Sequence, residues 1–157
     1  MQTKTRIIAA GVIAALSVAV PTVASAQGDE RSGGRRCERQ LAASAAAFDD
    51  AFVARDLDGF LSYVAEDAIQ IDREGVAFVG KDAIATFTEA VMRNDYTFVH
   101  SFMAQNVNDC KSANIVQDTT FAIPEFGLTL HMVDTVNWVR QHGEWKVALI
   151  QNTDFGA

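Results

Sequence analysis

The chain has 157 residues, of which 49% are hydrophobic and 21% charged, and its formal net charge is −7. This length argues for one domain, and the composition is that of a globular protein. The acidic balance argues against binding to nucleic acid or to an anionic membrane surface, because neither would attract a negatively charged protein.

The first 26 residues have the layout of a secretory signal peptide. Lys4 and Arg6 precede an apolar run at 7–20, and the segment ends in Ala24-Ser25-Ala26, an A-x-A cleavage pattern. The run is short for a bilayer span, and an uncleaved anchor is the alternative. We expect cleavage after Ala26 and a secreted or periplasmic protein that does not bind the membrane afterwards. Removing 26 of 157 residues, two of them basic, leaves 131 residues with 11 basic and 20 acidic side chains, a net charge of −9.

Cys37 and Cys110 are the two cysteines of the chain. An exported protein enters a compartment in which disulfides persist. We therefore expect a bond between them. Closing a loop of roughly 72 residues would add roughly 4 kcal/mol of stability in the chain-entropy model. Two free buried thiols are the alternative.

A long helix is predicted near the start of the mature chain. Residues 27–40 are polar, glycine-rich and aperiodic, which predicts a flexible leader ahead of a domain at 41–157. Apolar residues then recur at three- and four-residue steps, which predicts an amphipathic helix ending near Arg55. These residues are Leu41, Ala45, Phe48, Phe52 and Val53.

Two shorter helices and two short strands are predicted next. Asp56 has the features of an N-cap for a second helix that stops near Asp67. Strands are expected at 68–73 and 76–79, joined by a turn. A third helix opens at 80–82, with apolar residues on one of its faces.

The second half of the chain is rich in β-formers. Four stretches of about ten residues are separated by turn signals. Helices followed by long strands predict an α+β domain with a mostly antiparallel sheet, one face of which is covered by the helices. The four stretches are 96–107, 113–123, 128–140 and 145–153.

Short signatures recur along this pattern in a fixed order. They are DLDGF at 56–60, YVAEDA at 63–68, GKDAI at 80–84 and WKV at 145–147. Their order and spacing over 41–154 resemble the nuclear transport factor two-like superfamily, and within it the SnoaL-like and ketosteroid-isomerase-like proteins. The resemblance implies a cone-shaped, curved, mostly antiparallel sheet wrapped around a long N-terminal helix plus two shorter helices, as in cystatin-like folds. It further implies an apolar cavity for a small molecule and pairing into homodimers.

The resemblance also implies roles for three positions. The general-base aspartate of ketosteroid isomerases falls on Asp72, and the neutral aspartate that donates to the oxyanion falls on Asp134. The tyrosine that supplies the second donor falls on Phe48, which has no hydroxyl. Loss of one oxyanion donor typically costs about 2.7–4 kcal/mol of transition-state stabilisation, which argues against the steroid reaction itself.

The residues themselves support a special role for Asp134. By two-residue alternation its strand face is otherwise apolar, so the pKa of a buried carboxyl there should rise unless it finds a partner. A position where the face meets water, or a structural hydrogen bond, is the alternative. Asp72 is either a base or a turn residue partly neutralised by Arg73. The neighbours of Asp134 on its face are Leu130, Met132, Val136 and Trp138.

His100 alternates with Phe98 and Phe102 on a strand face. It is predicted to be either a core residue or an auxiliary acid/base, since the reference pKa of histidine lies near working pH. The three histidines lack the spacing of a metal site, so we predict no metal and no cofactor. The residues predicted to contact a ligand are Phe48, Phe52, Phe102, Met132 and Trp138.

Two main functional hypotheses follow. The first is a module that holds a small apolar molecule in the cavity without a demonstrated reaction. The second is a cofactor-free acid/base enzyme, such as an isomerase, cyclase or dehydratase, that uses Asp72 and Asp134. A third is a protein-interaction module that uses the outer face of the sheet. The missing hydroxyl at Phe48 favours the first hypothesis.

Overall fold

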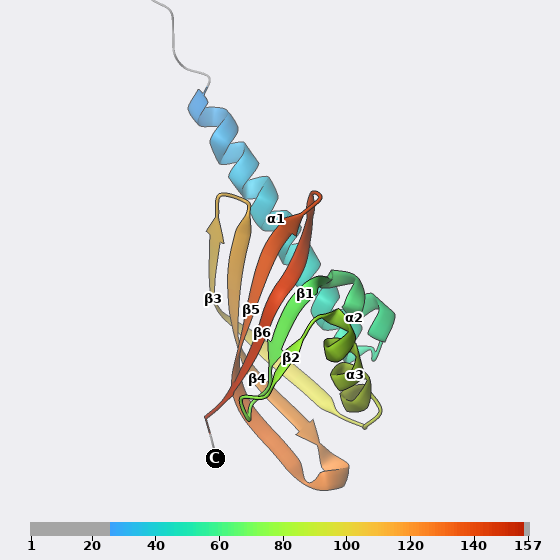
Figure 1. Ribbon diagram of the computed structural model, residues 1–157. Coiled ribbons are helices and arrows are strands. Elements are labelled where there is room, and N and C mark those ends of the chain that lie inside the picture. Colours follow the sequence, from blue (N-terminus) through green and yellow to red (C-terminus); the bar gives the residue numbers. More distant parts are fainter. Residues whose placement is uncertain (1–25, 156–157) are drawn as a thin grey trace, which may run out of the picture.

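The computed structural model describes residues 26–155, and side chains from Gly34 onward (Figure 1). The predicted signal peptide falls almost entirely outside these residues. Within 26–155 no helix is both long and apolar enough to cross a membrane. The elements in chain order are α1 (Ala26–Val53), α2 (Leu57–Tyr63), β1 (Val64–Ile71), β2 (Ala77–Val79), α3 (Lys81–Met92), β3 (Thr97–Asn108), β4 (Ser112–Ile123), the short helix η1 (Pro124–Phe126), β5 (Leu128–Gln141) and β6 (Glu144–Asp154).

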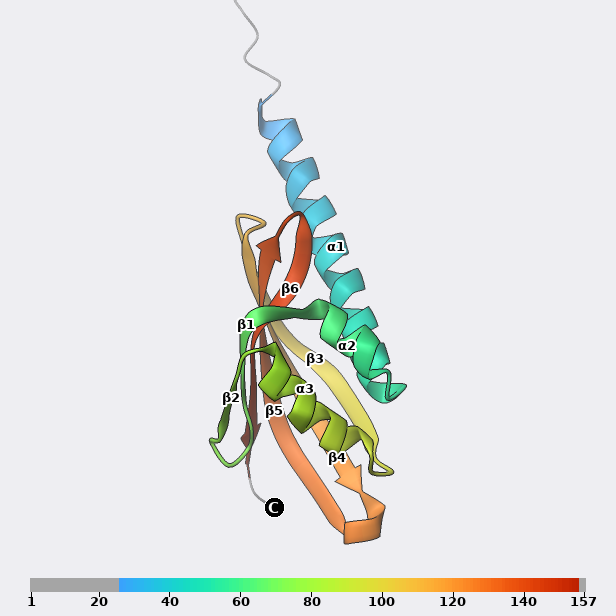
Figure 2. The same ribbon diagram turned by 45° about the vertical axis from the view of Figure 1, so that its right-hand side comes forward.

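A single curled sheet carries the three helices on one side (Figures 1 and 2). The strand order is β2-β1-β6-β5-β4-β3, so β2 and β3 are the two edges and the sheet does not close. Every neighbouring pair is antiparallel except β1 and β6, which are parallel. The predicted α+β fold with a mostly antiparallel, curved sheet is confirmed.

Helix α1 differs from the prediction at its start. It begins at Ala26, so the segment 27–40 that we expected to be a flexible leader is helical. Cys37 is 1% exposed and forms the predicted disulfide with Cys110, whose Cα lies 5.8 Å away. The bond fixes this part of the helix to the turn between β3 and β4, a tertiary constraint that local composition does not report. Disulfides of this kind are typical of oxidising, non-cytoplasmic compartments.

Helix α2 begins where the sequence predicts it. The Asp56 carboxylate accepts a 2.9 Å hydrogen bond from the amide of Gly59, a standard N-cap contact. A Cβ at Gly59 would collide with that carboxylate, so the cap depends on glycine there. The helix ends at Tyr63, earlier than expected, because Val64 already pairs with Val147 of β6.

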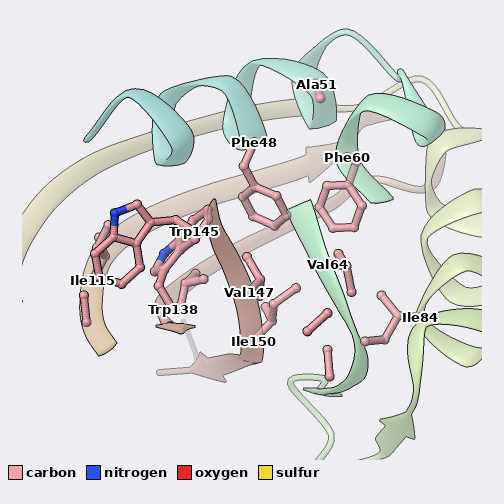
Figure 3. Packing of buried hydrophobic residues seen from close by; sticks show 14 of the residues in the cluster. Phe48, Ala51, Phe60, Val64, Ile84, Ile115, Trp138, Trp145, Val147 and Ile150 are labelled. Carbon is pink, nitrogen blue, oxygen red and sulfur yellow. The ribbon is translucent and has the colours of Figure 1, made fainter. Parts of the chain in front are cut away.

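The core fills one end of the cone. Alternate residues of β4 point towards the helices and are buried, as the two-residue period requires. Phe48 of α1 stacks on Phe60 of α2 with ring centroids 4.5 Å apart, and meets Trp138 edge-on at 5.6 Å. Figure 3 shows these rings with Trp145 beneath α1. This cluster closes the end of the cone near the disulfide and leaves the other end hollow.

Candidate functional site

A cavity of about 360 Å³ occupies the hollow end, between the concave face of the sheet and the three helices. Two of its lining residues, Arg73 and Glu74, are exposed, so it opens to solvent at the turn between β1 and β2. Most of its wall is hydrocarbon, as is usual for a site that binds a small molecule. The apolar lining comprises Phe48, Phe52, Phe60, Phe87, Val91, Phe98, Phe121, Ile123, Leu128, Leu130, Met132, Val136 and Ile150.

A row of polar side chains interrupts this apolar wall. Gln117 of β4, Asp134 of β5 and Asn152 of β6 are direct register partners, and all three line the cavity. Asn152 Nδ2 donates a 2.8 Å hydrogen bond to Asp134 Oδ1. Gln117 Nε2 donates a 3.1 Å hydrogen bond to Oδ2 of Asp49, which reaches the cavity from α1. Helix and sheet therefore each present one carboxyl group to the same space.

Asp134 is 5% exposed. Loss of hydration raises the pKa of its carboxyl above the ordinary aspartate value, because burial disfavours the charged form. The hydrogen bond from Asn152, the nearby hydroxyl of Thr119 and the charge of His100 lower the pKa of Asp134 without cancelling the rise. A carboxyl group that is protonated can donate a hydrogen bond to a carbonyl oxygen of a ligand.

Asp49 is a second, largely buried carboxyl in the cavity wall that the sequence analysis did not identify. Its side chain is 12% exposed, and burial raises the pKa of Asp49, with Asp50 and Asp134 adding to the rise. Gln117 and His100 oppose it, and His100 Nδ1 lies 3.6 Å from Asp49 Oδ2. The sequence contains a signal for this position: Asp49 follows Leu41 and Ala45 at four-residue steps, and so adjoins the apolar stripe of the helix.

Asp72 lines the cavity near its opening. Its Oδ1 accepts hydrogen bonds from the amides of Glu74 and Val76, at 2.9 and 2.8 Å. These contacts hold the turn between β1 and β2, so one carboxylate oxygen already has a structural role. The structure therefore does not group Asp72 with the row formed by Gln117, Asp134 and Asn152.

The other predicted site residues divide between the cavity and its surroundings. Phe48, Phe52 and Met132 belong to the lining. Trp138 does not, because it lies in the core that closes the cone, where it is 1% exposed. Phe102 does not either: it lies on the edge strand β3 and is 65% exposed.

His100 also lies outside the cavity lining, although it approaches Asp49. Its ring stacks on Phe98, with centroids 5.2 Å apart, and its side chain is 31% exposed. Its contact with the site is thus through the Asp49 carboxyl. Among residues 26–155, no group of three or more His, Cys, Asp or Glu side chains is arranged to hold a metal ion.

The predicted resemblance to SnoaL-like proteins is confirmed by comparison with known proteins. The model of the SnoaL-like domain family matches residues 45–141, which is more than half of the chain. The protein belongs to the SnoaL-like domain family. No curated protein matches its sequence.

Solved structures share the fold at low sequence identity. A ketosteroid isomerase-like protein from Erwinia carotovora atroseptica is 17% identical, with a TM-score of 0.64, over 76% of this chain and 96% of that one. A candidate dehydratase of the NTF2-like family from Streptomyces avermitilis is 14% identical, with a TM-score of 0.67, over 78% and 99%. A protein with a cystatin-like fold from Caulobacter vibrioides is 18% identical, with a TM-score of 0.67, over 77% and 91%.

Proposed function

We propose that this SnoaL-like domain holds a small, uncharged, mostly apolar molecule in the conical cavity, with a carbonyl oxygen facing Asp134. The observation that carries the proposal is a carboxyl group, 5% exposed, in the wall of a cavity lined mainly by hydrocarbon. Apolar walls supply affinity by removing ligand surface from water. A few polar groups fix the orientation of the ligand.

The protonation state of Asp134 decides which ligand group it favours. Burial raises its pKa and so favours the neutral form, which donates one hydrogen bond. An ionised carboxylate would instead repel the lone pairs of a carbonyl oxygen. Ligand affinity should therefore fall as the pH rises through the pKa of Asp134.

Calorimetric titration with 2-acetonaphthone, an apolar ketone, tests this function. We expect the wild type to bind it more tightly at low pH than at high pH. Asp134→Asn, which keeps a neutral donor, should bind with an affinity that changes much less with pH. Asp118→Asn, on the exposed face of the neighbouring strand, is the matched control and should behave like the wild type. Absence of binding at every pH would reject the proposed function.

Export is part of the proposal. The Cys37–Cys110 disulfide supports an oxidising location, and the first 26 residues have the charge and hydropathy pattern of a cleaved signal peptide. Expression of the full chain, followed by mass spectrometry of the exported protein, tests this proposal. An N-terminus at Gln27 is expected, and retention of Met1 in the exported protein would contradict it.

A second candidate function is acid/base catalysis without a cofactor. It is favoured by two carboxyls in the cavity wall, Asp49 and Asp134, because burial raises the pKa of both and repulsion from Asp134 adds to the rise at Asp49. When one is neutral, the other ionises more readily. Asp134 would then donate a proton to the carbonyl oxygen, while ionised Asp49 accepts one from the carbon beside it. The product is an enol, and reversal of both transfers regenerates the ketone.

Deuterium exchange of the methyl protons of 2-acetonaphthone, followed by NMR, tests this second function. Loss of a general base should slow the exchange by about 10²–10⁴-fold. We expect that loss in Asp49→Asn and a much smaller effect in Asp72→Asn, because Asp72 already accepts two backbone hydrogen bonds. The reverse ranking would assign the base to Asp72. No exchange above the buffer rate would reject catalysis of this kind and leave the binding function standing.

We also propose that the domain forms a homodimer through its sheet. Support comes from β3, whose outer edge pairs with no other strand of residues 26–155 and whose 12 residues include no Lys, Arg, Asp, Glu or Pro. Val99 is 66% and Met103 54% exposed on this strand. An uncharged, apolar edge strand favours association. Sedimentation velocity should give a dimer for the wild type and a monomer for a Val99→Lys/Met103→Lys variant, and a monomeric wild type would contradict the proposal.

A further inference from the structure

Gln70 is a polar side chain in the apolar wall of the cavity that the functions above do not use. It lies on β1, on the same face as Ala68, and is 7% exposed. Its register partners are Phe78 on β2 and Ile150 on β6, and both are apolar. The residue lines the cavity, but its amide oxygen is itself sealed from solvent, so a ligand reaches that oxygen only after the amide turns about its last side-chain bond.

The carbonyl oxygen of this amide has no hydrogen-bond partner among the residues that the structure describes. Buried polar atoms in folded proteins nearly always have one, and an exception calls for an explanation. The nitrogens of the two other cavity amides have partners, since Asn152 donates to Asp134 and Gln117 donates to Asp49. Gln70 Oε1 is therefore an acceptor that the fold itself leaves unused.

We infer that Gln70 Oε1 accepts a hydrogen bond from a hydroxyl or amide N–H group of the bound ligand. The inference rests on the proposed binding function and narrows its ligand class. The ligand would be an uncharged apolar molecule with two polar groups, an acceptor for Asp134 and a donor for Gln70. Hydroxyketones are the simplest members of this class.

The register places the two protein groups at separate points on the wall. Asp134 pairs with Asn152 on β6, whereas Gln70 pairs with Ile150, two residues earlier on the same strand. Both residues line the cavity, so a single ligand can contact both only if its acceptor and donor are spaced apart. A ligand with only one of the two groups leaves the other protein group without a partner, which lowers its affinity.

A set of ring-hydroxylated isomers of 2-acetonaphthone tests the inference, with 2-acetonaphthone itself as the reference. The isomers carry the same ketone and add a donor at different distances from it. For the wild type we expect at least one isomer to bind roughly tenfold more tightly than the reference, as one extra satisfied hydrogen bond in a buried site would give. Calorimetric titration at one fixed low pH measures all affinities under the same protonation state.

Gln70→Met keeps the size of the side chain and removes the amide. In this variant the hydroxylated isomer should bind no more tightly than 2-acetonaphthone, because the acceptor for its hydroxyl is gone. The melting temperature of the variant without ligand should equal or exceed that of the wild type, because a buried acceptor without a partner is removed. Gln151→Met, on the exposed face of β6, is the matched control and should retain the tighter binding of the isomer.

The outcomes separate this inference from the function on which it rests. If every isomer binds the wild type no better than 2-acetonaphthone does, then no ligand hydroxyl donates to Gln70. The inference is then wrong, while the binding function stands. The same holds if the tighter binding of the isomer persists in Gln70→Met. If neither the reference nor any isomer binds, the proposed function fails as well.

Discussion

Asn152 and Asp134 face each other across β6 and β5, and the amide of Asn152 donates a 2.8 Å hydrogen bond to the Asp134 carboxyl. The contact lowers the pKa of Asp134, whereas burial raises it by more. The site thus holds a carboxyl group whose protonation depends on the balance between one neighbouring amide and a hydrocarbon wall.

Asn152→Leu removes the hydrogen bond that lowers the pKa of Asp134. Without the amide donor, the ionised form of Asp134 loses stabilisation, so the pKa of Asp134 should rise further above the ordinary value. At neutral pH the variant should also unfold more easily than the wild type. NMR titration of the Asp134 carboxyl carbon in both proteins measures the change, and an unchanged or lower pKa in the variant would contradict the assigned role of the hydrogen bond.

Asp134→Asn should alter the pH dependence of stability. Because the folded pKa of Asp134 is raised, its contribution to stability is fully present below the unfolded value near 3.8 and is lost as the pH rises through the folded pKa. The neutral asparagine does not incur this loss. In urea unfolding, the unfolding free energy of the variant relative to that of the wild type should rise between acidic and neutral pH. Asp118→Asn is the control. A constant difference between variant and wild type at all pH values would be the contrary result.

The disulfide should contribute a large share of the stability of the domain. Cys37 and Cys110 are 73 positions apart, and the bond fixes a long helix to a turn of the sheet. A Cys37→Ser/Cys110→Ser variant should lose roughly 4 kcal/mol of unfolding free energy in the chain-entropy model. Urea denaturation measures it, with reduced wild type as a second comparison. A loss below about 1 kcal/mol would mean that the helix is held mainly by its packing.

Two phenylalanines that looked alike in the sequence should respond differently to substitution. Phe52 lines the cavity, whereas Phe102 is 65% exposed on β3. Phe52→Ala should weaken binding of 2-acetonaphthone by roughly tenfold or more, since it removes apolar contact area. Phe102→Ser should leave that affinity within about twofold of wild type. Equal effects of the two substitutions would mean that the ligand does not occupy this cavity.

Periodicity predicted most of the architecture because the same packing constraints act along each element. Alternation on β5 correctly singled out Asp134 as a polar residue on an apolar face. The parallel contact between β1 and β6 and the helical conformation of 27–40 were not predictable in this way. Both depend on contacts between segments far apart in the sequence.

The site was only partly predictable for a related reason. Alternation indicates which face a residue shares, but not whether another element covers that face, so Phe102 was expected in the cavity and is exposed. Asp49 adjoins the helical stripe, where a polar residue usually faces solvent, and its partner Gln117 lies 68 positions further along the chain. Gln70 lies on a short strand whose pairing was needed to place it.

The pKa of Asp134, measured by NMR titration of its carboxyl carbon in the mature protein, tests the central claim most directly. The claim requires a pKa clearly above the ordinary aspartate value of 3.8, with the signal unaffected by Asp118→Asn. Titration at or below 3.8 would mean that the carboxyl is ionised at working pH and donates no hydrogen bond, which would remove its proposed role in the site.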